Sequence, residues 1–332
     1  MAATLPLPKS VRSLDPFLVL LIAMVVLASL LPARGEAAVW TDRIADLAIA
    51  LLFFLHGAKL SREAIAQSIG NWRLHALVFA ATYILFPLAG LATVLLAGPW
   101  MNPLLLTGLL FLTLLPSTVQ SSIAFTAVAG GNVAAAVTSA SLSNLIGILL
   151  TPLLVGLFMK AGGGGGLSGW ASIQSIVVQL LVPFVGGHLL RPLIGGWVER
   201  NKTLLQPVDR GSILLVVYSA FSAAVVNGIW SRVGAVDLIE LILLSGVILA
   251  FIMGATLLAA RIFRLPRGDG IVLLFCGSKK SLVSGVPMAG ALFAPAQVGL
   301  VVLPLMIFHQ LQLFVCAVLA ARFRKQREGE RS

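Results

Sequence analysis

The chain has 332 residues, of which 59% are hydrophobic and 11% are charged, and its formal net charge is +11. A soluble domain usually carries about 25% charged residues, so this composition, with a mean hydropathy of +1.02, excludes a water-soluble globular protein. The 23 lysines and arginines are scattered between apolar stretches instead of forming one patch, which argues against a nucleic-acid partner. The sequence therefore predicts an all-α integral membrane protein.

Apolar stretches of about 20 residues, the length that crosses a ~30 Å hydrocarbon layer as a helix, follow one another along the whole chain. The first is expected to be a span and not a cleaved signal peptide, because the repeat described below is incomplete without it. We predict ten spans, at residues 16–33, 43–60, 73–97, 104–129, 132–159, 171–195, 210–230, 236–262, 270–293 and 297–322.

The distribution of basic residues predicts the orientation in the membrane. Seventeen of the 23 lysines and arginines fall on the side of the two termini, four fall on the other side, and Lys279 and Lys280 lie inside a span. By the positive-inside rule, both termini are expected to be cytoplasmic. All twelve acidic residues are expected in loops or near the ends of spans.

The two halves of the chain match each other. A shift of 165 positions aligns each of the first five spans with a partner in the second half. Five is an odd number, so the second half enters from the opposite side, as in an inverted-topology repeat. The predicted organisation is a first repeat (1–161), a Gly-rich outer connector (162–169), a second repeat (170–323) and a basic cytoplasmic tail (324–332).

Two predicted spans, 104–129 and 270–293, are interrupted in their middles at corresponding positions. At ~1.5 Å per residue, Pro116 in the first lies about 18 Å deep, and Lys279 and Lys280 in the second lie about 15 Å deep from the opposite face. Irregular backbone and lysines at that depth persist only where protein or a water-filled cavity surrounds them. We therefore expect the breaks to cross at the midplane and to form the binding site of a secondary transporter.

The residues at the breaks leave several chemical roles open. Hydroxyls, amides and carbonyls freed by Pro116 suit a small cation, whereas half-helix N-termini suit an anion. The two lysines could hold an anionic substrate, titrate and mimic a cation, or be held by free carbonyls that lock two helices together. Polar residues of the fifth span could instead serve close helix packing. The candidate binding residues are Ser117, Thr118, Gln120, Ser121, Ser122, Thr138, Asn144, Ser278, Lys279, Lys280, Ser281 and His309.

The sequence lacks metal-ligand spacing, a P-loop and a nucleophile triad, so we expect neither an enzyme nor a bound cofactor. Cys276 and Cys316 both fall within predicted spans and do not suggest a disulfide.

Several motifs resemble those of bile acid:sodium symporters. These are Gly130-Gly131-Asn132, Gly147 and the run 149–154 after the Pro-kinked fourth span. The second break and its flanks resemble the branch related to solute carrier family 10 member 7, which includes bacterial sodium-dependent transporters; the matching residues are Phe275, Cys276, Lys280, Ser281, Leu282, Gly285, Pro287 and Met288. The resemblance covers nearly the whole chain. It implies a panel of spans 1, 2, 6 and 7, a core of spans 3–5 and 8–10, and a bacterial inner membrane.

The chain departs from that family at the ion site. The resemblance implies two sodium ions held by a Ser-Asn pair in span four and by a Glu and a Gln at the span-nine crossing. Ser121-Ser122 matches the pair, the Glu falls near Phe275, and the Gln falls near Lys279. The exchange of an acid for lysines disfavours sodium coupling, and leaves a sodium ion possible only near Ser121 and Ser122.

The expected function is secondary active transport of a small organic anion by alternating access, with sodium or proton coupling left open. Lys280 first, and Lys279 second, would hold the anion or replace one sodium ion. The expected partners are this solute and the lipid bilayer, and the oligomeric state is left open. The alternative is a membrane regulator of cation (calcium) homeostasis with little or no transport turnover. A channel is a weaker alternative, because no segment resembles a selectivity filter.

Overall fold

The computed structural model describes residues 16–59, 71–161, 170–228, 231 and 233–329. Every regular element in these ranges is a helix. Seven of the described helical segments are long and apolar enough to cross a membrane, and two further apolar helices are shorter. The protein is therefore an all-helical, multi-pass membrane protein. The predicted Gly-rich connector at 162–169 lies outside the described residues.

Helices occupy each of the predicted spans, and several extend beyond the predicted ends; the helix of the second span begins seven positions earlier, at Glu36. The seventh predicted span begins eight positions earlier, at Lys202, and the last helix continues to Gly329, through most of the predicted tail. In chain order the elements are α1 (Pro16–Leu30), α2 (Glu36–Lys59), α4 (Trp72–Ala80), η3 (Ala81–Leu85), α5 (Phe86–Ala97), α6 (Pro103–Leu114), α7 (Gln120–Val128), α8 (Val133–Ala161), α9 (Trp170–Arg200), α10 (Lys202–Val226), α12 (Ala235–Ile262), α13 (Arg267–Gly277), α14 (Leu282–Leu292) and α15 (Pro295–Gly329).

The first predicted break separates α6 from α7. Asn102 caps the start of helix α6, because its side chain accepts a hydrogen bond from the backbone N–H of Leu104 at 3.0 Å. The helix ends at Leu114 because Pro116 disfavours helical backbone at the residue before it, and Leu115 is extended with φ −77° and ψ 158°. Pro116 also has no N–H to continue the hydrogen-bond ladder. The interruption therefore follows directly from the proline.

The second predicted break separates α13 from α14. Helix α13 ends at Gly277, and the chain is irregular through the two lysines. Ser281 then caps α14, because its hydroxyl accepts a hydrogen bond from the N–H of Ser284 at 3.1 Å. Both interruptions predicted from the sequence are present.

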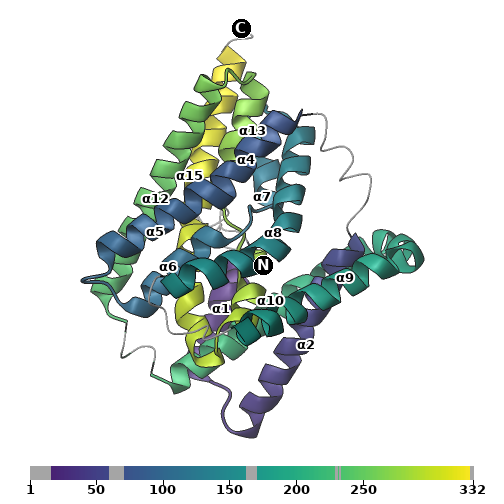
Figure 1. Cartoon of the computed structure of the whole chain (residues 1–332), viewed down its shortest axis with the longest axis vertical. Helices are drawn as coiled ribbons and strands as arrows, with labels where there is room; N and C mark the ends of the chain where they lie inside the picture. Colours follow the sequence, from purple (N-terminus) through teal and green to yellow (C-terminus); the bar gives the residue numbers. More distant parts are fainter. Residues whose placement is uncertain (1–15, 60–70, 162–169, 229–230, 232, 330–332) are drawn as a thin grey trace, which may run out of the picture.

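We divide the helices into two groups, which we name the panel group (α1, α2, α9 and α10) and the core group (α4 to α8 and α12 to α15). The two groups meet most extensively where α10 packs along α15. Helix α2 packs along α9 and α10, and α1 packs along α10, while α15 packs on α6 and α12 in the other group. Figure 1 shows α2 and α9 inclined together across the lower part of the molecule, whereas α12 and α15 rise toward the C-terminus.

Helices α2 and α9 approach each other so closely that glycine is required at the contact. A Cβ atom on Gly57 would overlap the carbonyl oxygen of Phe184, and one on Gly187 would lie 2.8 Å from the carbonyl carbon of Phe54. Small residues that let backbones meet are typical of helix contacts in membranes. The reciprocal pair fixes the register of α2 against α9.

We predict that Gly187→Ala destabilises the protein by about 1–3 kcal/mol, because the added methyl group is forced against the backbone of α2. The matched control is Gly186→Ala, one position earlier in α9, where a Cβ atom meets nothing within 4 Å. That variant should be neutral or stabilised by up to about 1 kcal/mol, since alanine favours helix over glycine. Thermal unfolding of the purified variants measures both, and equal midpoints would contradict the proposed contact.

Candidate functional site

The two breaks contact each other directly through hydrogen bonds to backbone carbonyls. The N–H of Ser281 donates to the carbonyl of Pro116 at 2.9 Å. In the other direction, the hydroxyl of Thr118 donates to the carbonyl of Lys280 at 2.7 Å. The irregular segments therefore satisfy each other's polar groups, as buried backbone requires where no water is available.

Two serines of the first break bind the end of α13. The hydroxyl of Ser117 donates to the carbonyl of Cys276 at 2.6 Å, and the hydroxyl of Ser122 donates to that of Phe275 at 2.9 Å. The last carbonyls of a helix have no partner within the helix. Both serine side chains are fully buried. They therefore act as caps supplied by another part of the chain.

Lys280 is fully buried and surrounded by backbone oxygens. Its Nζ donates to the carbonyls of Thr82 and Thr113, both at 2.8 Å, and to that of Leu115 at 2.6 Å. It also lies 4.2 Å from the centre of the Phe86 ring. All three N–H groups of an ammonium are thereby used. Lys280 thus links α13–α14, the end of α6 and the π-helical turn η3.

Lys279 is equally buried but has a different environment. Its Nζ donates to the hydroxyl of Ser121 at 2.8 Å and lies 4.3 Å from the centre of the Phe125 ring. No acidic side chain among the described residues forms an ion pair with either lysine. The adjacent lysines therefore point to different surroundings, one made of carbonyls and the other of a hydroxyl and an aromatic ring.

Helix α15 fixes the backbone of the second break. The side-chain amide of Gln312 accepts from the N–H of Lys280 at 2.8 Å and donates to its carbonyl at 2.9 Å. The same amide nitrogen lies 2.9 Å from Nδ1 of His309, whose side chain is buried. This two-way amide contact holds the lysine backbone in place from a helix about 30 residues away in sequence.

A cavity of about 450 Å³ lies beside the crossing, between the panel group and the core group. From the core group, hydroxyl, amide and imidazole side chains line it; these are Thr118, Gln120, Ser121, Ser141, Asn144, Ser281, Ser284 and His309. From the panel group come the charged and polar residues His56, Lys59, Gln206, Asp209 and Arg210. The cavity size falls within the usual range of small-molecule sites, about 300–1,000 Å³.

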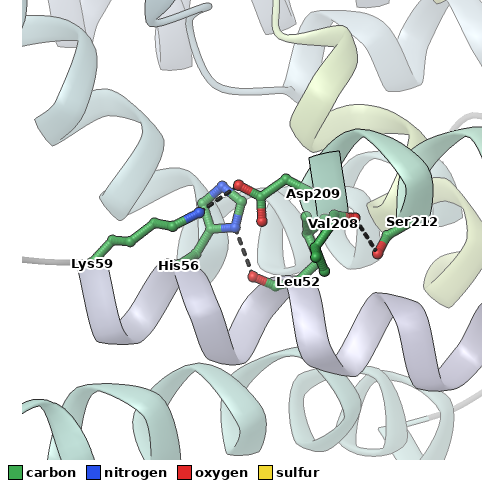
Figure 2. Close-up of polar contacts among 6 residues, drawn as sticks. All are labelled: Leu52, His56, Lys59, Val208, Asp209 and Ser212. Carbon is green, nitrogen blue, oxygen red and sulfur yellow. Dashed lines mark hydrogen bonds and ion pairs between the residues drawn. The ribbon is translucent and has the colours of Figure 1, made fainter. Parts of the chain in front are cut away.

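The panel side of the cavity contains a charged cluster (Figure 2). Lys59 of α2 forms an ion pair with Asp209 of α10, and this is the one ion pair found among the residues that the structure describes. His56 donates from Nδ1 to the carbonyl of Leu52 at 2.7 Å, because a carbonyl can only accept. Its ring points toward Lys59 and Asp209. The second carboxylate oxygen of Asp209 is buried without a protein partner within the described ranges.

Arg210 is the cavity's unpaired cation among the described residues. Its guanidinium lies 5.6 Å from the centre of the Phe17 ring, and no hydrogen bond or ion pair with a described residue engages it. Eight residues of α10 precede it, so it lies roughly 12 Å along the helix. An arginine has five N–H donors in a planar fork that matches carboxylate and phosphate groups.

The structure separates the residues predicted for the site into three sets. The first lines the cavity and consists of Thr118, Gln120, Ser121, Asn144, Ser281 and His309. The second lies at the crossing but outside the cavity lining and consists of Ser117, Ser122, Ser278, Lys279 and Lys280. Thr138 belongs to neither set, since its hydroxyl donates to the carbonyl of Ala134 in its own helix at 3.1 Å. Within the described residues, no group of three His, Cys, Asp or Glu side chains could hold a metal ion.

The panel side of the cavity was not predicted from the sequence. Asp209 was expected in a loop or near the end of a span, and it occupies the eighth position of α10, which begins at Lys202. Polar residues one turn apart on each panel helix could have revealed the site. His56 and Lys59 are three positions apart, as are Gln206 and Asp209, so each pair shares one helix face.

The chain belongs to a family of membrane transporters. The model of the SBF-like CPA transporter family (DUF4137) matches residues 15–325. The chain is 53% identical over 320 residues to "Putative symporter YfeH" of Escherichia coli (strain K12), covering 96% of each chain. It is 54% identical over 314 residues to protein PA2026 of Pseudomonas aeruginosa, covering 95% of this chain and 94% of that one. It is 28% identical over 313 residues to "Sodium/bile acid cotransporter 7-B" of Xenopus laevis, covering 91% and 90%.

We predict that Ser117→Ala and Ser122→Ala each destabilise the protein by about 1–3 kcal/mol, because each leaves a buried carbonyl at the end of α13 without its donor. The matched control is Ser278→Ala, in the second break. Its hydroxyl donates to the carbonyl of Leu274, which also accepts the N–H of Ser278 and so keeps a partner. The thermal unfolding midpoint of the control should be higher than those of the other two variants. The reverse order would contradict the capping role.

Proposed function

We propose that this protein is a secondary active transporter that moves a small organic anion by alternating access between the panel group and the core group. Each predicted inverted repeat, residues 1–161 and residues 170–323, contributes two spans to the panel group and three spans to the core group. The proposal assigns ten spans, with α6–α7 and α13–α14 as the broken spans that cross near the membrane midplane.

The observation that carries the proposal is the cavity between the groups, with neutral polar side chains on one wall and Arg210 on the other. Lys59 and Asp209 compensate each other's charge. Arg210 then gives the cavity a net positive charge that an anionic group of the solute would neutralise. Gln120, Asn144 and His309 would contact the remaining polar groups of the solute.

The same cavity suggests which side is open. Lys59 and Arg210 are among the basic residues that the positive-inside rule assigns to the cytoplasmic side of the membrane. We assign the structure to an inward-facing state in the bacterial inner membrane, with both termini in the cytoplasm. The hydrogen bonds between the breaks would let the core group move as one body, carrying its wall of the cavity past the panel group.

In this mechanism the crossing lysines have a different role from the one first expected from the sequence. Lys280 gives its three donors to carbonyls, so the direct anion contact passes to Arg210 in our proposal. Lys279 reaches the cavity wall through the hydroxyl of Ser121 and would set the charge beside the solute. A sodium site near Ser121 and Ser122 would have to displace the hydrogen bonds that both hydroxyls now make.

We predict that Arg210→Gln lowers uptake of an anionic solute by about 10- to 100-fold, because a charge-assisted contact is worth about 1.5–3 kcal/mol. Purified protein in liposomes would be tested with radiolabelled carboxylates, sulfonates and sugar phosphates, each beside its neutral analogue. The matched control is Arg43→Gln. Arg43 also lies over an aromatic ring, that of Trp40, 5.5 Å from its centre, but it is exposed and does not line the cavity.

The outcomes separate the parts of the proposal. Uptake of anions that Arg210→Gln reduces and Arg43→Gln spares supports both transport and the anion contact. Uptake of neutral analogues alone would contradict the anionic substrate. If no solute of either kind moves, the alternative of a membrane regulator of cation homeostasis replaces the transporter.

A further inference from the structure

Two prolines leave carbonyls around Lys280 without a hydrogen-bond donor in their own helices. In the π-helical turn η3, the N–H of Phe86 bonds to the carbonyl of Ala81, five residues back, so it is not available to Thr82. The next N–H in line for Thr82 would come from position 87, which is Pro87 and has none. The carbonyl of Thr82 therefore lacks a partner in its own helix and accepts from Lys280.

The end of α6 supplies the other two oxygens in the same way. The N–H groups in line for Thr113 belong to positions 116 and 117. Pro116 has none, and that of Ser117 donates to the hydroxyl of Ser143 at 3.1 Å. Leu115 is already extended, so its carbonyl points out of the helix ladder. Three oxygens from two separate segments thus converge on one point, which is the geometry of a cation site.

The cation in that site is part of the protein. Carbonyl oxygens only accept hydrogen bonds, and a neutral amine has two N–H groups, so all three contacts at 2.6–2.8 Å can be hydrogen bonds only if the group is the protonated ammonium. The Phe86 ring, 4.2 Å away, adds a cation–π contact. Within the described chain, no acid pairs with Lys280, and the residue does not line the cavity.

We infer that the ammonium of Lys280 permanently fills a monovalent-cation site between the two breaks, so that the crossing needs no sodium ion at this point. Lys279 serves as the internal comparison, because its Nζ contacts a hydroxyl and a ring instead of three carbonyls. The inference depends on the proposed transport only in what it implies about sodium coupling. The site itself can be tested without any solute.

The test measures the thermal midpoint of the full-length purified protein at constant ionic strength. Lys280→Ala should lower the midpoint by about 5–10 °C, because three buried carbonyls lose their donor. Propylammonium, which replaces the missing part of the side chain, should restore the midpoint in a concentration-dependent way. Tetramethylammonium has the same charge but no N–H group, so it should not. The matched variant Lys279→Ala should not respond to propylammonium.

Two outcomes would overturn the inference: a Lys280→Ala midpoint equal to that of the wild type, or equal rescue by tetramethylammonium. The wild-type protein gives a second test that needs no variant. With the site filled, its midpoint should be the same in sodium, potassium and choline chloride, and stabilisation by sodium alone would overturn the inference even if Lys280→Ala does not fold. None of these measurements contains a transported solute. A failure of the proposed transport would therefore leave their results unchanged.

Discussion

Inside a bilayer an unpaired backbone carbonyl has no water to bond to, and each one left alone costs several kcal/mol. This constraint organises the centre of the molecule. Pro87 and Pro116 remove N–H groups from two helices, and the break before α14 ends a third. The freed oxygens are satisfied by side chains from other elements, namely a lysine and buried hydroxyl groups. The crossing is therefore stable because side chains from other elements donate hydrogen bonds to its freed carbonyls.

The same constraint separates the rigid part of the structure from its cavity. Ser117, Ser122 and Lys280 are fully buried, and their polar groups are used within the core group. The cavity wall is different: the amide of Gln120 is exposed, and Arg210 has no polar partner among the described residues. Groups without partners are the ones that a ligand can engage. Structural and ligand-binding roles are thus divided between neighbouring residues.

The sequence predicted the two breaks well, because a proline and paired lysines within apolar runs have few structural explanations. Free carbonyls were one of three roles left open for the lysines, but the sequence could not predict which carbonyls Lys280 binds. The carbonyl of Thr82 lies 198 positions away, and it is freed only by the π-helical turn before Pro87. The panel side was missed for another reason. Polar residues at the start of α10 lower its hydropathy, so the predicted span begins only at Arg210, and neither Asp209 nor Arg210 was considered for the site.

The two lysines show how position alone can assign different tasks to one residue type. In a carbonyl cage an ammonium is held by three short bonds, and movement would leave three oxygens unpaired. Beside Ser121 and Phe125, the ammonium makes one hydrogen bond and one ring contact, so its two remaining N–H groups have no partner among the described residues. Movement of Lys279 therefore breaks fewer bonds than movement of Lys280. Of the two ammonium groups, only that of Lys279 is bonded to a residue of the cavity wall, Ser121, so a change in the cavity can reach it while the ammonium of Lys280 keeps its three carbonyls.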